Sequence, residues 1–191
     1  LDSAQALGAP TIRVWAGAKN REDCSGDEIE TVLADARRIA DLAADKGVSI
    51  TFEFHGGSLT NNNANAARLS EELQHPNIFF SWQPPHGFTP EHCCAGLEAL
   101  LGRLSTVHVY HWTIGAYEEN LYSEAERSLK WPEDYNMHPL EDGMDRWKAY
   151  IQRIQAAGQP HPFLLEFVKG GSLEQAHRDA KTLKHLLSGS T

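Results

Sequence analysis

The sequence predicts an α/β fold in which parallel β-strands alternate with α-helices. Short apolar runs, rich in β-branched and aromatic residues, alternate with longer segments whose apolar residues recur at helical spacing. Strands that alternate with helices imply right-handed crossover connections, and therefore strands that all point the same way. Polar residues that could carry chemistry also stand at the ends of most predicted strands, and α/β proteins keep their sites at the carboxyl ends of their strands.

Five strand–helix pairs account for most of the chain. The segments that carry the predicted strands are 10–17, 48–57, 77–87, 105–112 and 162–171. The helices that follow them are predicted at 27–47, 63–73, 89–104, 145–158 and 172–187. Pro84 and Pro85 should end the third strand, because proline cannot donate to a sheet ladder, and Thr89 and Ser172 are predicted helix caps. The remaining stretch, 113–142, is long for a loop and is predicted to act as a lid.

Composition narrows the functional classes. Hydrophobic residues make up 41% and charged residues 23% of the 191 residues, which is ordinary for a globular protein. The net charge of −9, with scattered basic residues, argues against a nucleic-acid partner. No stretch has the length of a transmembrane helix, so no membrane partner is expected. The cysteines Cys24, Cys93 and Cys94 form no disulfide framework or CxxC motif, and we expect reduced thiols and a cytoplasmic location.

Two glutamates stand inside apolar runs, Glu53 in TFEF and Glu166 in LLEF. A buried, unpaired carboxylate is costly, so each needs a cation, a metal ion or a strong set of hydrogen bonds. A structural ion pair is the ordinary explanation for one such glutamate. Two at equivalent strand ends, with His108 placed in the same way, favour a site for Mn²⁺, Mg²⁺, Co²⁺ or Zn²⁺.

These residues, together with Gln83 and His86 in SWQPPHG, resemble the sugar phosphate isomerase/epimerase group of xylose-isomerase-like TIM barrels. The resemblance covers nearly the whole chain. It implies a (β/α)8-type fold and one divalent metal ion, held by a Glu, an Asp, a His and a second Glu at the ends of the last four strands. Glu53, Gln83, His108 and Glu166 fall on these positions, with Gln83 where the family has Asp. His86 matches the family's substrate-contacting histidine.

The resemblance implies a metal-dependent isomerase or epimerase that acts on a sugar or sugar phosphate through an enediolate. In that role Glu53 and Glu166 would transfer protons on the two faces of the substrate, and His86 would polarise a substrate oxygen. The arginine that the epimerases place shortly after the histidine ligand is missing from HVYHWTIG. Two alternatives stay open, a dehydratase on the same scaffold and a sugar-binding protein without turnover. An endonuclease-IV-like repair enzyme is disfavoured by the acidic charge.

Aromatic and imidazole side chains at the strand ends predict a substrate-binding surface. His55 should lie on the same side of its strand as the preceding glutamate. Trp15 and Trp112 stand where aromatic rings can stack on the C–H face of a sugar. His111 is expected to pack or to support the site, and Trp82 should point toward the helices as part of the core.

The chain is predicted to form one domain over residues 1–191 that is an incomplete barrel. An eight-stranded barrel of this type needs about 250 residues, and LDSAQALG reads as the end of a helix that closes on Gly8. We therefore expect about five parallel strands with helices on the outer face, without the N-terminal βα units of the family. The exposed edge of the first strand would favour pairing with another chain, and a homo-oligomer is expected.

Overall fold

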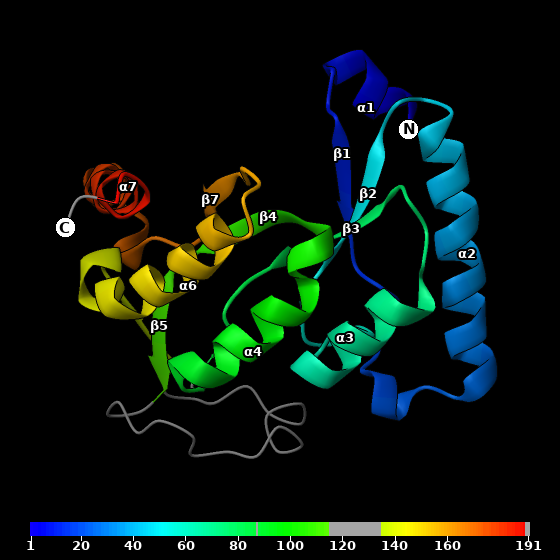
Figure 1. Cartoon of the computed structure of the whole chain (residues 1–191), viewed down its shortest axis with the longest axis horizontal. Coiled ribbons are helices and arrows are strands. Elements are labelled where there is room, and N and C mark those ends of the chain that lie inside the picture. The colour runs from blue at the N-terminus through cyan, green and yellow to red at the C-terminus, as the bar shows by residue number, and fades with distance from the viewer. Residues whose placement is uncertain (87, 115–134, 190–191) are drawn as a thin grey trace. The chain divides into compact units, whose positions relative to one another are not determined.

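The computed structural model describes residues 1–86, 88–114 and 135–189 (Figure 1). The chain divides into two compact units. The N-terminal unit comprises residues 1–82 with 102–105, and the C-terminal unit comprises residues 83–101 with 106–191. The prediction of one domain over the whole chain stays a prediction. None of the described helices is long and apolar enough to cross a membrane.

The predicted set of five parallel strands with helices is confirmed. The strands are β1 Thr11–Val14, β2 Ser49–Glu53, β3 Ile78–Trp82, β4 Leu104–Val109 and β7 Phe163–Leu165. Their order in the sheet is β1-β2-β3-β4-β7, as expected for part of a (β/α)8 barrel. The pairs β1–β2, β2–β3 and β4–β7 are each parallel. The third strand ends at Trp82, before Pro84 and Pro85, as their missing N–H groups require.

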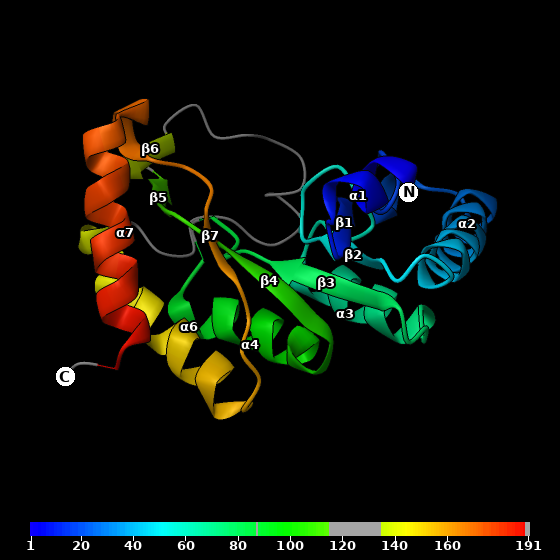
Figure 2. The ribbon, with the colours of Figure 1, turned by 90° about the horizontal axis from the view of Figure 1, so that it is seen from above.

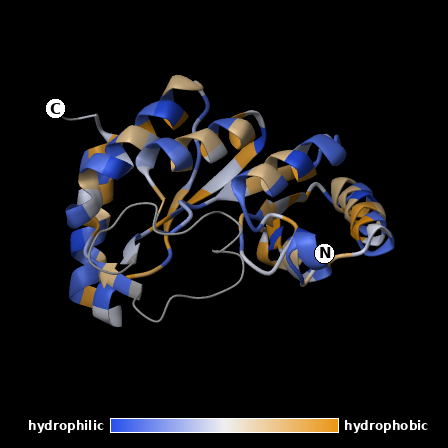
Figure 3. Cartoon of the chain, turned by 90° about the horizontal axis from the view of Figure 1, so that it is seen from below, coloured by the Kyte–Doolittle hydropathy of each residue, from blue (hydrophilic) through white to orange (hydrophobic). Residues whose placement is uncertain are grey.

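In the N-terminal unit, one face of the strands forms the core with the helices. Its helices are α1 Asp2–Leu7, α2 Gly26–Ala44 and α3 Asn63–Glu72, with the 3₁₀ turn η1 Arg21–Asp23. Polar and apolar residues alternate in bands around the helices (Figure 3). Ile50, Phe52, Phe80 and Trp82 are buried. Because side chains alternate along a strand, Glu53 lies on the other face.

Caps and one arginine fix the ends of these helices. Ser25 begins α2 with a capping box, in which its hydroxyl accepts from the Glu28 N–H and the Glu28 carboxylate accepts from the Ser25 N–H. Gly8 ends α1 in the left-handed conformation, as predicted. After α3, the Arg103 guanidinium donates to four backbone carbonyls, those of Ser70, Leu73, His75 and Ile78. Arg103 therefore ties the turn before β3 to the start of β4.

The C-terminal unit packs helices against β4 and β7 (Figure 2). Its helices are α4 Pro90–Leu100, α6 Met144–Ala156 and α7 Leu173–Leu187, with 3₁₀ turns η3 Leu140–Gly143 and η4 Lys169–Gly171. The 3₁₀ turn η2 Leu101–Arg103 begins in this unit and ends in the N-terminal unit. Its core contains Trp147, Tyr150 and Leu97, and the Trp147 indole N–H donates to the Tyr110 carbonyl at 2.9 Å. The caps Thr89 and Ser172 are confirmed.

The segment after β4 differs from its prediction. The sequence predicts one strand over 105–112 and one loop over 113–142, but β4 ends at Val109 and a new strand, β5 His111–Ile114, pairs antiparallel with β6 Tyr135–His138. Alternating polar and aromatic residues conceal the break, because HVYHWTI has the composition of a single continuous strand. The middle of the predicted lid, 115–134, lies outside the described residues.

Candidate functional site

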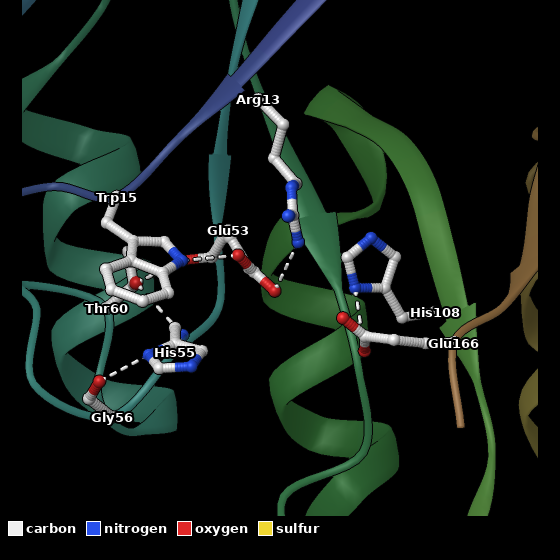
Figure 4. A network of polar contacts seen from close by, with 8 residues as sticks. All are labelled: Arg13, Trp15, Glu53, His55, Gly56, Thr60, His108 and Glu166. Atoms are coloured by element: carbon white, nitrogen blue, oxygen red, sulfur yellow. Dashed lines mark hydrogen bonds and ion pairs between the residues drawn. The ribbon is translucent and has the colours of Figure 1, made fainter. Parts of the chain in front are cut away.

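The Glu53 carboxylate, at the carboxyl end of β2, is 2% exposed and is compensated by two side chains from β1 and the residue that follows it (Figure 4). Its Oε1 lies 2.9 Å from Arg13 Nη1, and its Oε2 accepts a hydrogen bond of 2.5 Å from Trp15 Nε1. The carbonyl of the same residue accepts from the Thr60 hydroxyl. The ion pair considered as an alternative in the sequence is therefore present, and its cation comes from the neighbouring strand.

Trp15 and His55 form a stacked pair beside this carboxylate (Figure 4). The ring centroids are 4.2 Å apart with 17° between the planes. The Gly56 carbonyl contacts His55 Nδ1 and fixes the imidazole. Trp15 remains 53% exposed although its N–H is bound to the carboxylate. The two predicted substrate-binding residues of this unit are thus brought together, with the indole both orienting Glu53 and facing solvent.

Ser81 lies beside Glu53 on the adjacent strand and was missed by sequence reasoning. The β2–β3 register places the two residues opposite each other, and Ser81 is 1% exposed. Its hydroxyl has no hydrogen-bond partner among the described residues. A buried hydroxyl of this kind calls for a water molecule or a ligand.

In the C-terminal unit, His108 and Glu166 are brought together by the pairing of β4 with β7. Val109 pairs with Leu165, and the Glu166 N–H donates to the Val109 carbonyl, which continues the ladder past the end of β7. His108 Nδ1 lies 3.2 Å from Glu166 Oε2 (Figure 4). The His108 side chain is 4% exposed and that of Glu166 is 24% exposed. The imidazole is therefore enclosed, while the Glu166 side chain is partly exposed although its Oε2 is buried.

The proline segment after β3 is anchored through its carbonyls. The Tyr110 hydroxyl donates to the Pro84 carbonyl at 3.1 Å and lies 3.5 Å from His86 Nε2. The Cys93 thiol donates to the Pro85 carbonyl at 3.7 Å. These contacts hold the backbone of the two residues immediately before His86.

An aromatic cluster surrounds that imidazole. His86 stacks on Trp112 with 4.8 Å between centroids and 21° between planes. The Phe167 ring is 38% exposed, and its centroid lies 4.7 Å from that of Trp112. The centroids of the Tyr110 and His86 rings are 5.1 Å apart. The predicted substrate-binding residues His86 and Trp112 therefore meet in one cluster, to which Tyr110 and Phe167 were not assigned from the sequence.

His111 is held in a tight, buried environment. It is 5% exposed, and its ring packs against Gly143. Any larger residue at position 143 would place its Cβ only 2.6 Å from the imidazole, which is too close for a normal contact. Burial, followed by the nearby His138 and Arg146, lowers the pKa of His111 to about 4, against the opposing effect of Asp142. The imidazole is therefore neutral at physiological pH, which suits the packing role expected for it.

The residue types at the strand ends suit a divalent cation. Glu53, His108 and Glu166 offer two carboxylates and an imidazole, a donor set that could hold a metal ion. Gln83 follows β3 directly and would add a neutral oxygen. Glu53 belongs to the N-terminal unit and the other three to the C-terminal unit. The convergence of all four on one ion stays a prediction.

The sequence contains a pattern that could have placed Arg13 beside Trp15. Arg13 and Trp15 are two residues apart in RVW, and strand periodicity places them on the same side. The register that sets Arg13 beside the end of β2 comes from tertiary structure. Tyr110 and Ser81 gave no comparable signal, because each looks like an ordinary strand residue.

Comparison with known proteins identifies a family and a fold. A family model described as "Xylose isomerase-like TIM barrel" matches residues 1–186. The probable 3-DHS dehydratase of Bacillus anthracis is similar with a TM-score of 0.73 and 20% identity, covering 99% of this chain and 69% of that chain. A xylose isomerase-like TIM barrel protein from Mycobacterium smegmatis, in complex with magnesium, has a TM-score of 0.71 and 14% identity, covering 98% of this chain and 64% of that chain.

A D-allulose 3-epimerase from Methylomonas sp., in complex with D-allulose, is similar with a TM-score of 0.56 and 17% identity, covering 86% of this chain and 52% of that chain. The chain thus spans between 52% and 69% of the length of these three structures. At such identities the likeness establishes the fold alone. A comparison with curated proteins found no match.

Proposed function

Because the chain belongs to the xylose isomerase-like TIM barrel family, we propose that it is a divalent-metal-dependent isomerase or epimerase acting on a sugar or sugar phosphate. The observation that carries the proposal is the His108–Glu166 pair, which stands at the ends of adjacent parallel strands. Glu53 occupies the corresponding end of β2, and the family pattern assigns metal ligands to these positions. Glu53, Gln83, His108 and Glu166 would hold the ion.

Proton transfer falls to the two glutamates. One carboxylate removes the proton beside the substrate carbonyl, the electron pair moves onto the carbonyl oxygen to give an enediolate, and an acid returns the proton. When bound, a divalent ion supplies positive charge that stabilises the developing oxyanion. Glu166 is the more accessible proton carrier, since its side chain is 24% exposed against 3% for Glu53.

The remaining predicted residues bind and orient the substrate. His86, whose backbone is anchored through Pro84 and Pro85, would hydrogen-bond a substrate oxygen. Trp112 stacks on His86 and Trp15 stacks on His55, so each imidazole is backed by an indole. These aromatic surfaces suit the C–H face of a sugar ring.

Deuterium exchange tests the proposal without knowledge of the natural substrate. Neutral ketoses, including D-allulose, and their phosphates would be incubated with the protein and Mn²⁺ in D₂O, and exchange beside the carbonyl followed by NMR. Glu166→Gln should lower the exchange rate by at least about 100-fold. Glu98→Gln is the matched control, because Glu98 is exposed and paired with Arg153 on the helices. Exchange that survives both Glu166→Gln and EDTA would overturn the proposal.

The same experiment separates the alternatives. Loss of water with the appearance of an unsaturated carbonyl would indicate a dehydratase. Sugar binding without exchange would indicate a binding protein.

The proposal extends to location and assembly. The three cysteines are free thiols, which supports a cytoplasmic location. The expected homo-oligomer is kept as part of the proposal, and light scattering on the purified chain would test it.

A further inference from the structure

The Glu53 carboxylate is held differently at its two oxygens (Figure 4). Oε2 accepts from the Trp15 indole N–H, a neutral donor, while Oε1 lies 2.9 Å from the charged Arg13 guanidinium. Both partners come from β1 or the residue after it, and the parallel β1–β2 register fixes them beside the end of β2. One oxygen is thus oriented by a neutral group and the other is neutralised by a cation.

The exposure of the two partners is unequal. The Glu53 side chain is 3% exposed, whereas that of Arg13 is 49% exposed. The Glu53 carboxylate is enclosed by the protein, whereas about half of the Arg13 side chain already faces solvent and has room to move outward. Arg13 is therefore the displaceable partner of the pair.

A second arginine–glutamate pair in the same unit shows the contrast. Arg21 lies 2.6 Å from Glu72, but here the arginine side chain is 5% exposed and the glutamate is shared with Arg68. That arrangement encloses the cation and suits a structural ion pair. The Arg13 pair encloses the anion and leaves the cation facing solvent.

We propose that Arg13 is a built-in counter-charge that neutralises Glu53 in the metal-free protein and competes with a divalent cation for Glu53 Oε1. The inference rests on the proposed function, because it takes Glu53 to be a metal ligand. Two cations at one carboxylate oxygen repel each other, so metal binding requires Arg13 to withdraw. The Trp15 hydrogen bond keeps the carboxylate oriented while this exchange takes place.

Calorimetric titration of the full chain with MnCl₂ at mildly alkaline pH tests the competition. Arg13→Gln should bind Mn²⁺ about tenfold more tightly than the wild type, which corresponds to about 1.4 kcal/mol. Arg38→Gln is the matched control, because it removes the same charge from a surface pair with Asp35 on α2, and should stay within about threefold of the wild type. Unchanged or weaker binding by a folded Arg13→Gln protein would overturn the inference.

A measurement on the unmodified protein keeps the test valid if Arg13→Gln does not fold. Phenylglyoxal labels accessible guanidinium groups, and mass mapping reports the labelling rate of each arginine. Saturating MnCl₂ should raise the rate at Arg13 and leave the rate at Arg38 unchanged. An unchanged or slower rate at Arg13 would count against displacement.

The outcomes distinguish this inference from the proposed function. If the wild type binds Mn²⁺, Glu166→Gln abolishes binding, and Arg13→Gln gives no gain, only the competition is wrong. If neither the wild type nor Arg13→Gln binds Mn²⁺, the metal-dependent function fails and the competition fails with it.

Discussion

Replacing His111 by phenylalanine should remove much of the acid sensitivity of the C-terminal unit. His111 begins β5 and is 5% exposed. Burial, His138 and Arg146 lower its pKa from 6.5 to about 4, with Asp142 acting in the opposite direction. Because the folded-state pKa lies below the unfolded value, the unfolded chain takes up the proton first as the pH falls. The stabilising contribution is therefore complete above about pH 6.5 and is lost progressively as the pH falls toward about 4.

The size of the effect follows from the shift. A pKa lowered from 6.5 to about 4 corresponds to roughly 3 kcal/mol when the whole range is titrated. Between about pH 7 and about pH 5, linkage gives a loss of about 2 kcal/mol. A phenyl ring keeps an aromatic side chain against Gly143 but cannot take up a proton, so the variant should lack this loss.

Urea denaturation at a series of pH values, followed by tryptophan fluorescence, measures the effect. The wild type should lose about 2 kcal/mol over this range from His111, and His111→Phe should lose correspondingly less. His177→Phe, the same change at an exposed position on α7, is the control and should behave as the wild type. An equal loss of stability in His111→Phe and the wild type would refute the assigned role.

Three further substitutions test the anchoring of the site, the turn before β3 and the proposed ligand Gln83. Tyr110→Phe removes the hydroxyl bound to the Pro84 carbonyl, so the free energy of unfolding should change by only about 1 kcal/mol. The kcat for deuterium exchange should fall while KM changes little. An unaltered kcat would contradict the positioning role. Arg103→Met deprives four carbonyls of their donor and should cost about 3–5 kcal/mol, seen as lost hydrogen-exchange protection in α3. Gln83→Asp adds a carboxylate, so calorimetry should show about tenfold tighter Mn²⁺ binding. An unchanged affinity would place Gln83 away from the ion.

The sequence was sufficient to predict the strands and helices because local signals agreed with the fold. Thr89 with Pro90 begins α4, and Ser172 begins α7. The exception was the run from Leu104 to Ile114, which is β4 followed by β5. Its break depends on β5 pairing with β6, more than twenty positions later in the chain, and no local pattern reports such a pairing.

The candidate site was predictable in its residue types but only partly in its contacts. Strand periodicity and the family pattern identify Glu53, His108 and Glu166 as strand-end residues. They do not predict the Arg13–Glu53 ion pair, because it depends on the register between β1 and β2, which the crossover connection sets and which neither strand shows on its own. Sequence reasoning therefore favoured a metal ion over an ion pair as the compensating charge, and it did not identify Arg13 as the partner of Glu53.

The two prolines of SWQPPHG contribute acceptors as well as a strand end. Each carries a carbonyl but no N–H, so a proline pair leaves only acceptors to be satisfied. Tyr110 and Cys93 supply the two donors, one from the residue after β4 and one from α4. A peptide with ordinary residues at these positions would carry two further N–H groups in need of partners beside the site. The proline pair thus allows a segment next to a buried strand to be pinned by two side chains, with His86 held immediately after it.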